Sequence, residues 1–219
     1  MNTLTKLALG LMGQIMARPA VGRAAATLAL PLATRQGGMP LMEALWQRQS
    51  QRDFSPEPLD PQRLSDLLWA AAGINRPELG GRTAPSAMNA QEVELYVALA
   101  KGLFRYEPKA HQLQRVLRSD VRRLTGCQDF VDNAALDLIY VADHSRMALV
   151  PAAKRESFAF AAAGAMAQNV YLYCASAGLA SVIRAWFDHH ALSQAMGLGA
   201  DQQLLLSQTV GARPGDEPA

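Results

Sequence analysis

Two arginines that bracket a serine are the residues in this chain whose types and spacing most clearly suggest chemistry. Arg48, Ser50 and Arg52 follow the amphipathic segment 41–47. If that segment is a helix that continues, side chains four residues apart point the same way. Both guanidiniums could then bind one doubly charged group, most simply a phosphate. The alternative is a solvated basic helix end facing the negative pole of the helix dipole.

The stretch 74–90 is a second candidate site. It is rich in Gly, Pro, Asn, Ser and Thr. Loops of this length without structure are uncommon in compact domains and tend to carry function. Ser86 and Asn89 lie in this stretch and could hydrogen-bond the polar edge of a ring, or could satisfy the backbone of their own turn.

Motifs for nucleophilic or metal chemistry are missing from the sequence. There is no GxGxxG between a strand and a helix, no GxxxxGK[ST] and no GxSxG. The neighbours His189 and His190 would face different ways on a helix and make a poor chelate, so no metal site is expected. Cys127 and Cys174 have no zinc spacing, and Cys174 lies in an apolar stretch typical of inert core. If the chain is an enzyme, an organic cofactor is expected to carry the chemistry.

Composition indicates one globular domain. The chain has 219 residues, of which 50% are hydrophobic, and a net charge of +2 from 21 basic and 19 acidic residues, so no nucleic-acid partner is expected. No apolar run is long enough to span a bilayer. Residues 1–25 are expected to form an N-terminal extension, either a helical arm or, as a minority alternative, a cleaved export signal. We otherwise expect a cytoplasmic protein.

Helices and strands are predicted without regular alternation, which favours an α+β fold around a central mixed or antiparallel sheet flanked by helices. Asp60 should cap a helix that has Pro61 at its first position and ends at Gly73. The longest predicted helix, 154–177, is rich in alanine, which suits a buried central helix or a subunit interface. The predicted strands are a hairpin over 92–100 and 102–106, a buried strand over 136–142, and two later strands over 180–187 and 203–210.

Four sequence blocks in this order resemble the nitroreductase-like FMN flavoproteins, and among them the compact SagB/ThcOx-type branch is the most similar. The blocks are RQSQR at 48–52, LLWAAAGINR at 67–76, RTAPSAMNAQ at 82–91, and QNVYL at 168–172 leading through Gly178-Leu179 to Phe187-Asp188. The first and third blocks match the R-x-S-x-R and P-S-x-x-N-x-Q motifs of the family. The resemblance implies a nitroreductase-like FMN-binding domain over 26–219, a long central helix and an obligate homodimer.

The resemblance also implies roles for individual residues. Arg48, Ser50 and Arg52 would hold the FMN phosphate and ribityl chain, and Gln49 would reach the flavin ring. Pro85, Ser86 and Asn89 match the loop that closes on the flavin, from the partner subunit. The backbone of Ile183, Arg184 and Ala185 would face the reactive N5 edge.

The implied function is an FMN-dependent oxidoreductase working by ping-pong hydride transfer. NAD(P)H would be the donor, and a quinone, a nitro compound or a similar small molecule the electron acceptor. One alternative is a SagB-like oxidase or dehydrogenase of azoline heterocycles in a modified peptide. Another is a non-catalytic flavin-binding dimer whose pocket is closed by Trp186.

The sequence departs from the family pattern in three places. Arg184 and Trp186 stand where many relatives have an acidic residue and a glycine, which predicts narrower substrate access. The basic C-terminal tail of longer relatives is missing, which leaves Arg213 as a stand-in at the phosphate. Residues 1–25 have no clear counterpart.

Overall fold

A single antiparallel sheet organises the protein. The computed structural model describes residues 26–215, and within them seven strands form the sheet in the order β1-β6-β5-β4-β7-β9-β8. The strands are β1 Thr27–Ala29, β4 Val93–Leu99, β5 Gly102–Glu107, β6 Gln112–Leu117, β7 Leu136–Asp143, β8 Leu179–Arg184 and β9 Gln202–Ala212. The predicted α+β class is confirmed.

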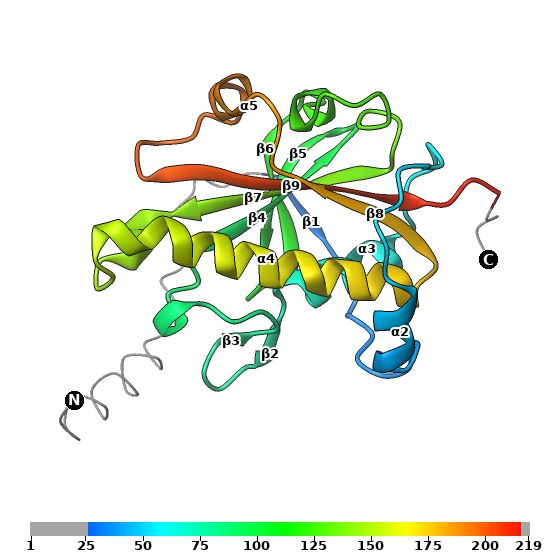
Figure 1. Cartoon of the computed structure of the whole chain (residues 1–219), viewed down its shortest axis with the longest axis horizontal. Coiled ribbons are helices and arrows are strands. Elements are labelled where there is room, and N and C mark those ends of the chain that lie inside the picture. The colour runs from blue at the N-terminus through cyan, green and yellow to red at the C-terminus, as the bar shows by residue number, and fades with distance from the viewer. Residues whose placement is uncertain (1–25, 216–219) are drawn as a thin grey trace.

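Helices cover both faces of this sheet (Figure 1). The α-helices are α2 Leu41–Gln47, α3 Pro61–Ala72, α4 Ala152–Ser176 and α5 His189–Met196. Figure 1 shows α4 running along one face of the sheet, with α5 on the opposite side. The smaller elements are the hairpin of β2 Ile74–Arg76 and β3 Gly81–Arg82, and the 3-10 helices η1 Ala87–Asn89, η2 Arg122–Thr125 and η3 His144–Met147.

Alternation along the central strands divides the core into two layers. On β7, Leu138 and Tyr140 pack towards α3 and α4, whereas Ile139 and Val141 pack towards α5. Successive side chains of a strand point to opposite faces, so a strand covered on both sides is apolar throughout. Asp137 lies on β7 between two such residues and is fully buried.

Local signals account for several element boundaries. The Asp60 side chain accepts hydrogen bonds from the backbone N–H groups of Gln62 and Arg63, which confirms the predicted cap. The predicted helix 154–177 is α4, shifted by two residues at its start. The predicted strand 180–187 ends earlier, because β8 leaves the sheet after Arg184. The edge strand β1 and its partner β6 were not anticipated.

The ends of the chain fall outside this description. The predicted N-terminal extension, residues 1–25, lies outside the described residues, as do residues 216–219. Between residues 26 and 215, no helix is both long enough and apolar enough to cross a membrane.

Candidate functional site

The segment that carries the two arginines is not helical. Helix α2 ends at Gln47, and Arg48 has φ −58° and ψ 122°, so the prediction that Arg48 and Arg52 share a helix face is wrong. The Gln51 N–H donates to the Ser181 carbonyl at 3.0 Å, and this bond holds the segment along the free edge of β8.

Tyr171 of α4 brings together residues from two candidate regions. Its hydroxyl lies 2.8 Å from Ser50 Oγ and accepts the Ile183 N–H at 2.9 Å. The Arg48 guanidinium carbon lies 5.3 Å from the centre of the Tyr171 ring, within the range of a cation–π contact. Sequence reasoning quoted Tyr171 within a motif but gave it no role. The available signal was a phenol in the alanine-rich stretch of this helix, since a buried tyrosine hydroxyl usually has a partner.

A small polar pocket borders this segment. Gln49 and Gln51 line it together with Ser181, Tyr171 and Arg213. The Nε of Arg213 is buried and has no hydrogen-bond partner among residues 26–215. Because a buried donor without a partner is costly, this atom suits an anion that residues 26–215 do not supply.

The charges of this region are unbalanced. Over residues 26–215, no carboxylate lies within ion-pair distance of Arg48, Arg52 or Arg213. Arg48 is half-buried and Arg52 is exposed. A hydroxyl with several guanidiniums that lack anionic partners is the donor set that a phosphate monoester requires. The residues present therefore fit the phosphate end of FMN.

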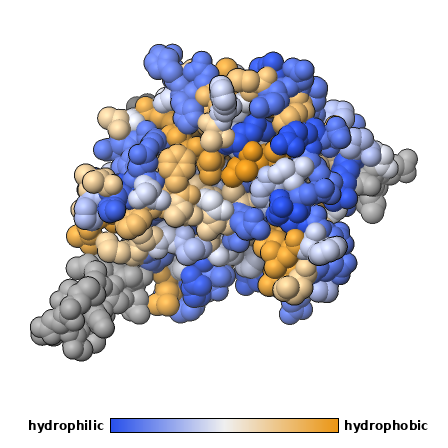
Figure 2. Space-filling model, in the orientation of Figure 1, coloured by the Kyte–Doolittle hydropathy of each residue, from blue (hydrophilic) through white to orange (hydrophobic). Residues whose placement is uncertain are grey.

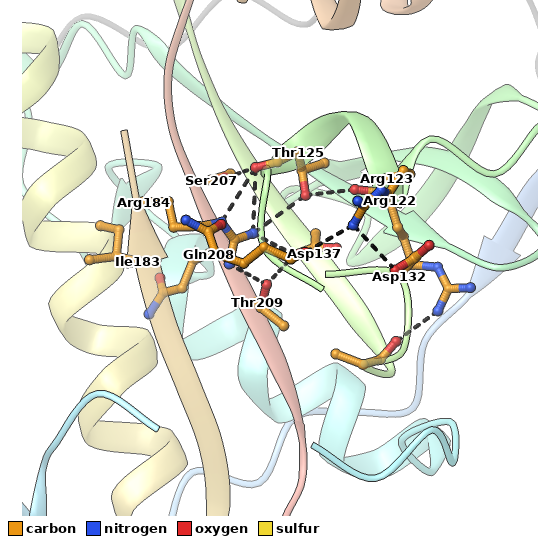
Figure 3. A network of polar contacts seen from close by, with 12 residues as sticks. Arg122, Arg123, Thr125, Asp132, Asp137, Ile183, Arg184, Ser207, Gln208 and Thr209 are labelled. Carbon is orange, nitrogen blue, oxygen red and sulfur yellow. Dashed lines mark hydrogen bonds and ion pairs between the residues drawn. The ribbon is translucent and has the colours of Figure 1, made fainter. Parts of the chain in front are cut away.

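The Arg184 side chain faces away from this region. It crosses to the opposite face of the sheet, where Nη2 donates to Asp137 Oδ1 at 2.9 Å and Nη1 donates to Thr209 Oγ1 at 2.6 Å (Figure 3). Burial raises the pKa of Asp137 above its ordinary value, and Arg184 and Thr209 offset part of that rise. The prediction that the Arg184 side chain narrows substrate access is wrong, because alternation along β8 turns it into the core.

The chain after β8 presents aromatic groups beside Ala185. His189 Nε2 lies 3.1 Å from the Ala185 carbonyl and must donate to it, since a carbonyl only accepts. The His189 ring stacks on Phe187 with centroids 4.2 Å apart. Trp186 is 85% exposed in the isolated chain. Cys174 is buried as predicted, and burial raises the pKa of its thiol to about 12, which suits an inert core residue.

The second candidate loop satisfies its own polar groups. Ser86 Oγ accepts the Gln91 N–H at 3.0 Å, and Asn89 Oδ1 accepts from Gln91 Nε2 at 3.0 Å. Met88, Asn89 and Gln91 all have left-handed backbone, with φ of 53°, 53° and 50°. Such positions cost about 1–3 kcal/mol each and persist where the surroundings impose them. Pro85 is exposed at the start of this loop.

This loop and the arginine segment lie apart in one protomer. Arg146, just before α4, donates to the Gln91 carbonyl at 3.5 Å, so the loop lies near the N-terminal end of α4. Tyr171, which contacts Ser50, lies 19 residues beyond Ala152. At 1.5 Å per residue this is roughly 28 Å along the helix. Pro85, Ser86 and Asn89 are therefore not brought together with Arg48, Ser50 and Ile183 within one chain.

Comparisons with known proteins agree on one family. The family model described as "Nitroreductase family" matches residues 45–212. The curated protein "Putative nitroreductase MJ1384" of Methanocaldococcus jannaschii is 31% identical over 160 residues, which cover 68% of this chain and 80% of that protein.

Solved structures of similar fold include members of the same family. A crystal structure titled "putative nitroreductase" from Ralstonia eutropha JMP134 is 50% identical, has a TM-score of 0.83, and the match covers 92% of this chain and 96% of that one. The NADPH:FMN oxidoreductase of Vibrio harveyi, complexed with NAD+, has a TM-score of 0.58 at 18% identity, over 82% of this chain and 72% of that one. At that identity the second structure shows a shared fold only.

Proposed function

Because the chain belongs to the nitroreductase family, we propose that it is an FMN-dependent oxidoreductase that transfers hydride from NAD(P)H to a quinone, nitro compound or similar small acceptor. The observation that supports this most directly is the convergence of Arg48, Ser50 and Ile183 on the Tyr171 side chain. Through these contacts, Tyr171 connects the cationic segment 48–52 to the end of β8. FMN would supply reversible hydride acceptance at its N5 atom, and the chain would supply binding and orientation.

The proposed phosphate site uses the cationic groups of the region. Arg48 and Arg52 would bind the phosphate oxygens, Ser50 would donate from its hydroxyl, and Gln49 would reach the flavin ring. Arg213 is a further candidate, because its buried Nε has no partner within residues 26–215. Guanidinium forks match phosphate geometry and keep their charge at every physiological pH.

The proposed ring site lies along the free edge of β8. The Ser181 carbonyl and the Ile183 N–H point outward to Gln51 and Tyr171, whereas Arg184 pairs inward with Ser207 of β9. Ala185 is the first residue beyond the strand. The Ile183 N–H is already occupied by Tyr171. Of the three residues expected at N5, Ala185 is therefore the one whose N–H we assign to stabilise negative charge there.

We further propose that the active form is a homodimer with FMN at the interface. The partner's loop would supply Pro85, Ser86 and Asn89, which lie too far along α4 to reach the same flavin from one chain. The exposed apolar surface over α2 and α4 supports this arrangement (Figure 2). It includes Leu41, Met42 and Trp46 on α2, and Phe158 and Phe160 on α4. Light scattering should give twice the mass of one chain; a monomer that binds FMN fully would refute the interface site.

Flavin binding is the experiment that tests the proposal. Purified protein should be yellow, and Arg48→Ala or Arg52→Ala should each weaken FMN binding by about 1.5–3 kcal/mol, as for a hydrogen bond to a charged group. Arg118→Ala is the matched control, because Arg118 is an exposed arginine just after β6, distant in sequence from the site. Full FMN occupancy of both site variants at micromolar concentration would overturn the phosphate assignment.

Reduction by nicotinamide separates the proposal from its alternatives. Rapid anaerobic bleaching of bound FMN by NADPH or NADH supports the NAD(P)H-driven reaction. Bound FMN that neither nucleotide bleaches would favour the dehydrogenase of peptide azolines, which needs no such donor. A wild-type protein that turns over would exclude the non-catalytic dimer, whereas turnover only after Trp186→Gly would support it.

A further inference from the structure

The Tyr171 hydroxyl lies in a hydrogen-bond chain in which the direction of one bond is fixed. A backbone N–H can only donate, so the phenol oxygen accepts from Ile183. The phenol proton is then available for Ser50 Oγ, 2.8 Å away. With that oxygen acting as acceptor, the Ser50 proton is left to point elsewhere. The chain therefore links the Ile183 amide through Tyr171 to Ser50, whichever of the two hydroxyls donates.

The two ends of this chain differ in their surroundings. Tyr171 is 7% exposed, whereas Ser50 lies in the exposed segment beside β8. Among residues 26–215, β8 is the last strand of the sheet, so no strand in this range accepts the Ile183 N–H on its outer edge. The Tyr171 phenol oxygen instead accepts the hydrogen bond from this N–H. One side chain thereby fixes both the edge of β8 and the position of the serine hydroxyl.

We propose that Tyr171 is a positioning residue that holds the phosphate-binding Ser50 and the flavin-facing end of β8 in a fixed relation. The inference rests on the proposed function, in which both Ser50 and the end of β8 contact the bound FMN. The hydroxyl has this role separately from the ring, which packs under Arg48. Phenylalanine keeps the ring and removes only the oxygen, so Tyr171→Phe isolates the positioning contribution.

The experiment compares three variants of the full-length protein. Tyr171→Phe removes the bridge, and Ser50→Ala removes its outer end. Tyr173→Phe is the matched control, because the Tyr173 hydroxyl comes from the same helix and donates to the Arg63 carbonyl at 3.3 Å, away from the site. FMN dissociation constants come from fluorescence titration. Rates of FMN reduction by NADPH are then measured by stopped flow with FMN saturating.

Tyr171→Phe and Ser50→Ala should each raise the FMN dissociation constant about 10-fold, as for one lost hydrogen bond. The FMN dissociation constant of the double variant should stay within about 3-fold of that of the single variant that binds FMN more weakly. Both substitutions remove parts of the same chain of hydrogen bonds. Tyr171→Phe should also slow FMN reduction at least about 5-fold, since small misplacements at the reacting atom are costly. Tyr173→Phe should match the wild type in both measurements.

Either of two results would overturn the inference. One is an additive double variant, with a dissociation constant raised about 100-fold. The other is a Tyr171→Phe protein whose reduction rate stays within about twofold of the wild type. Both results can be obtained only if the wild-type protein binds FMN. A wild type that binds none would instead refute the proposed function, and the inference would fall with it.

Discussion

The buried ion pair between Arg184 and Asp137 allows the sharpest stability prediction. Asp137 is 0% exposed and Arg184 8% exposed. Asp137 Oδ1 accepts from Arg184 Nη2 at 2.9 Å and from the Thr209 hydroxyl, while Oδ2 has no partner among residues 26–215. Arg184→Met would remove the only cation within ion-pair distance in that range and leave a buried carboxylate uncompensated. Breaking such a pair from one side costs about 3–5 kcal/mol.

Thermal unfolding monitored by circular dichroism measures this cost. For a domain of this size, 1 kcal/mol corresponds to roughly 2–4 °C, so a loss of about 4 kcal/mol lowers Tm by about 8–16 °C. The double variant Arg184→Met/Asp137→Leu should recover most of the loss, because apolar groups of similar volume can replace a buried pair. Arg123→Met is the control. Its partner Asp132 lies 3.7 Å away and both side chains are about half exposed, so it should cost less than about 1 kcal/mol.

The pH dependence of the Arg184→Met variant provides a second check. Burial raises the pKa of Asp137 in the folded protein, and loss of the arginine should raise it further. A carboxyl whose folded pKa lies above its unfolded value loses stability as pH rises between the two values. The variant should therefore recover stability as pH is lowered towards the unfolded pKa. A loss below about 1 kcal/mol at pH 7, or one independent of pH, would refute the reasoning.

Two further predictions concern buried titratable groups outside the site. Glu92 is fully buried, neither carboxylate oxygen has a partner within residues 26–215, and burial raises its pKa against the influence of Arg82. Stability is then lost as pH rises from the unfolded pKa through the folded pKa of Glu92. Glu92→Gln should weaken this pH dependence of the free energy of unfolding measured in urea; an unchanged dependence would count against this. The His111 ring contacts Ser65 Oγ and the Tyr106 hydroxyl, and burial lowers its pKa. Wild-type stability should fall as pH drops below about 6.5, and His111→Gln should lose that dependence; the same acid sensitivity in both proteins would contradict it.

Family membership and several element boundaries could be read from short stretches of sequence. The Asp60 cap, the alanine-rich helix that became α4, and the buried strand around Leu138 are encoded by residues close together in the chain. These signals are local because capping, helical periodicity and β-branched or apolar runs act over one or two turns. The order of the motifs likewise identified the family, whose model matches residues 45–212.

The candidate site depended on the tertiary structure. Whether Arg48 continued a helix was decided by the bond from Gln51 to the edge of β8, 130 residues later in the chain. Ser50 and Tyr171 meet across a separation of 121 residues. Alternation about the sheet turned the Arg184 side chain into the core, although the family resemblance had predicted that it narrows substrate access. The sequence by itself determined which groups the chain carries and where its local elements start. Only the packing of α4 and β8 decided which groups touch, because contacts between distant residues depend on sheet order and register.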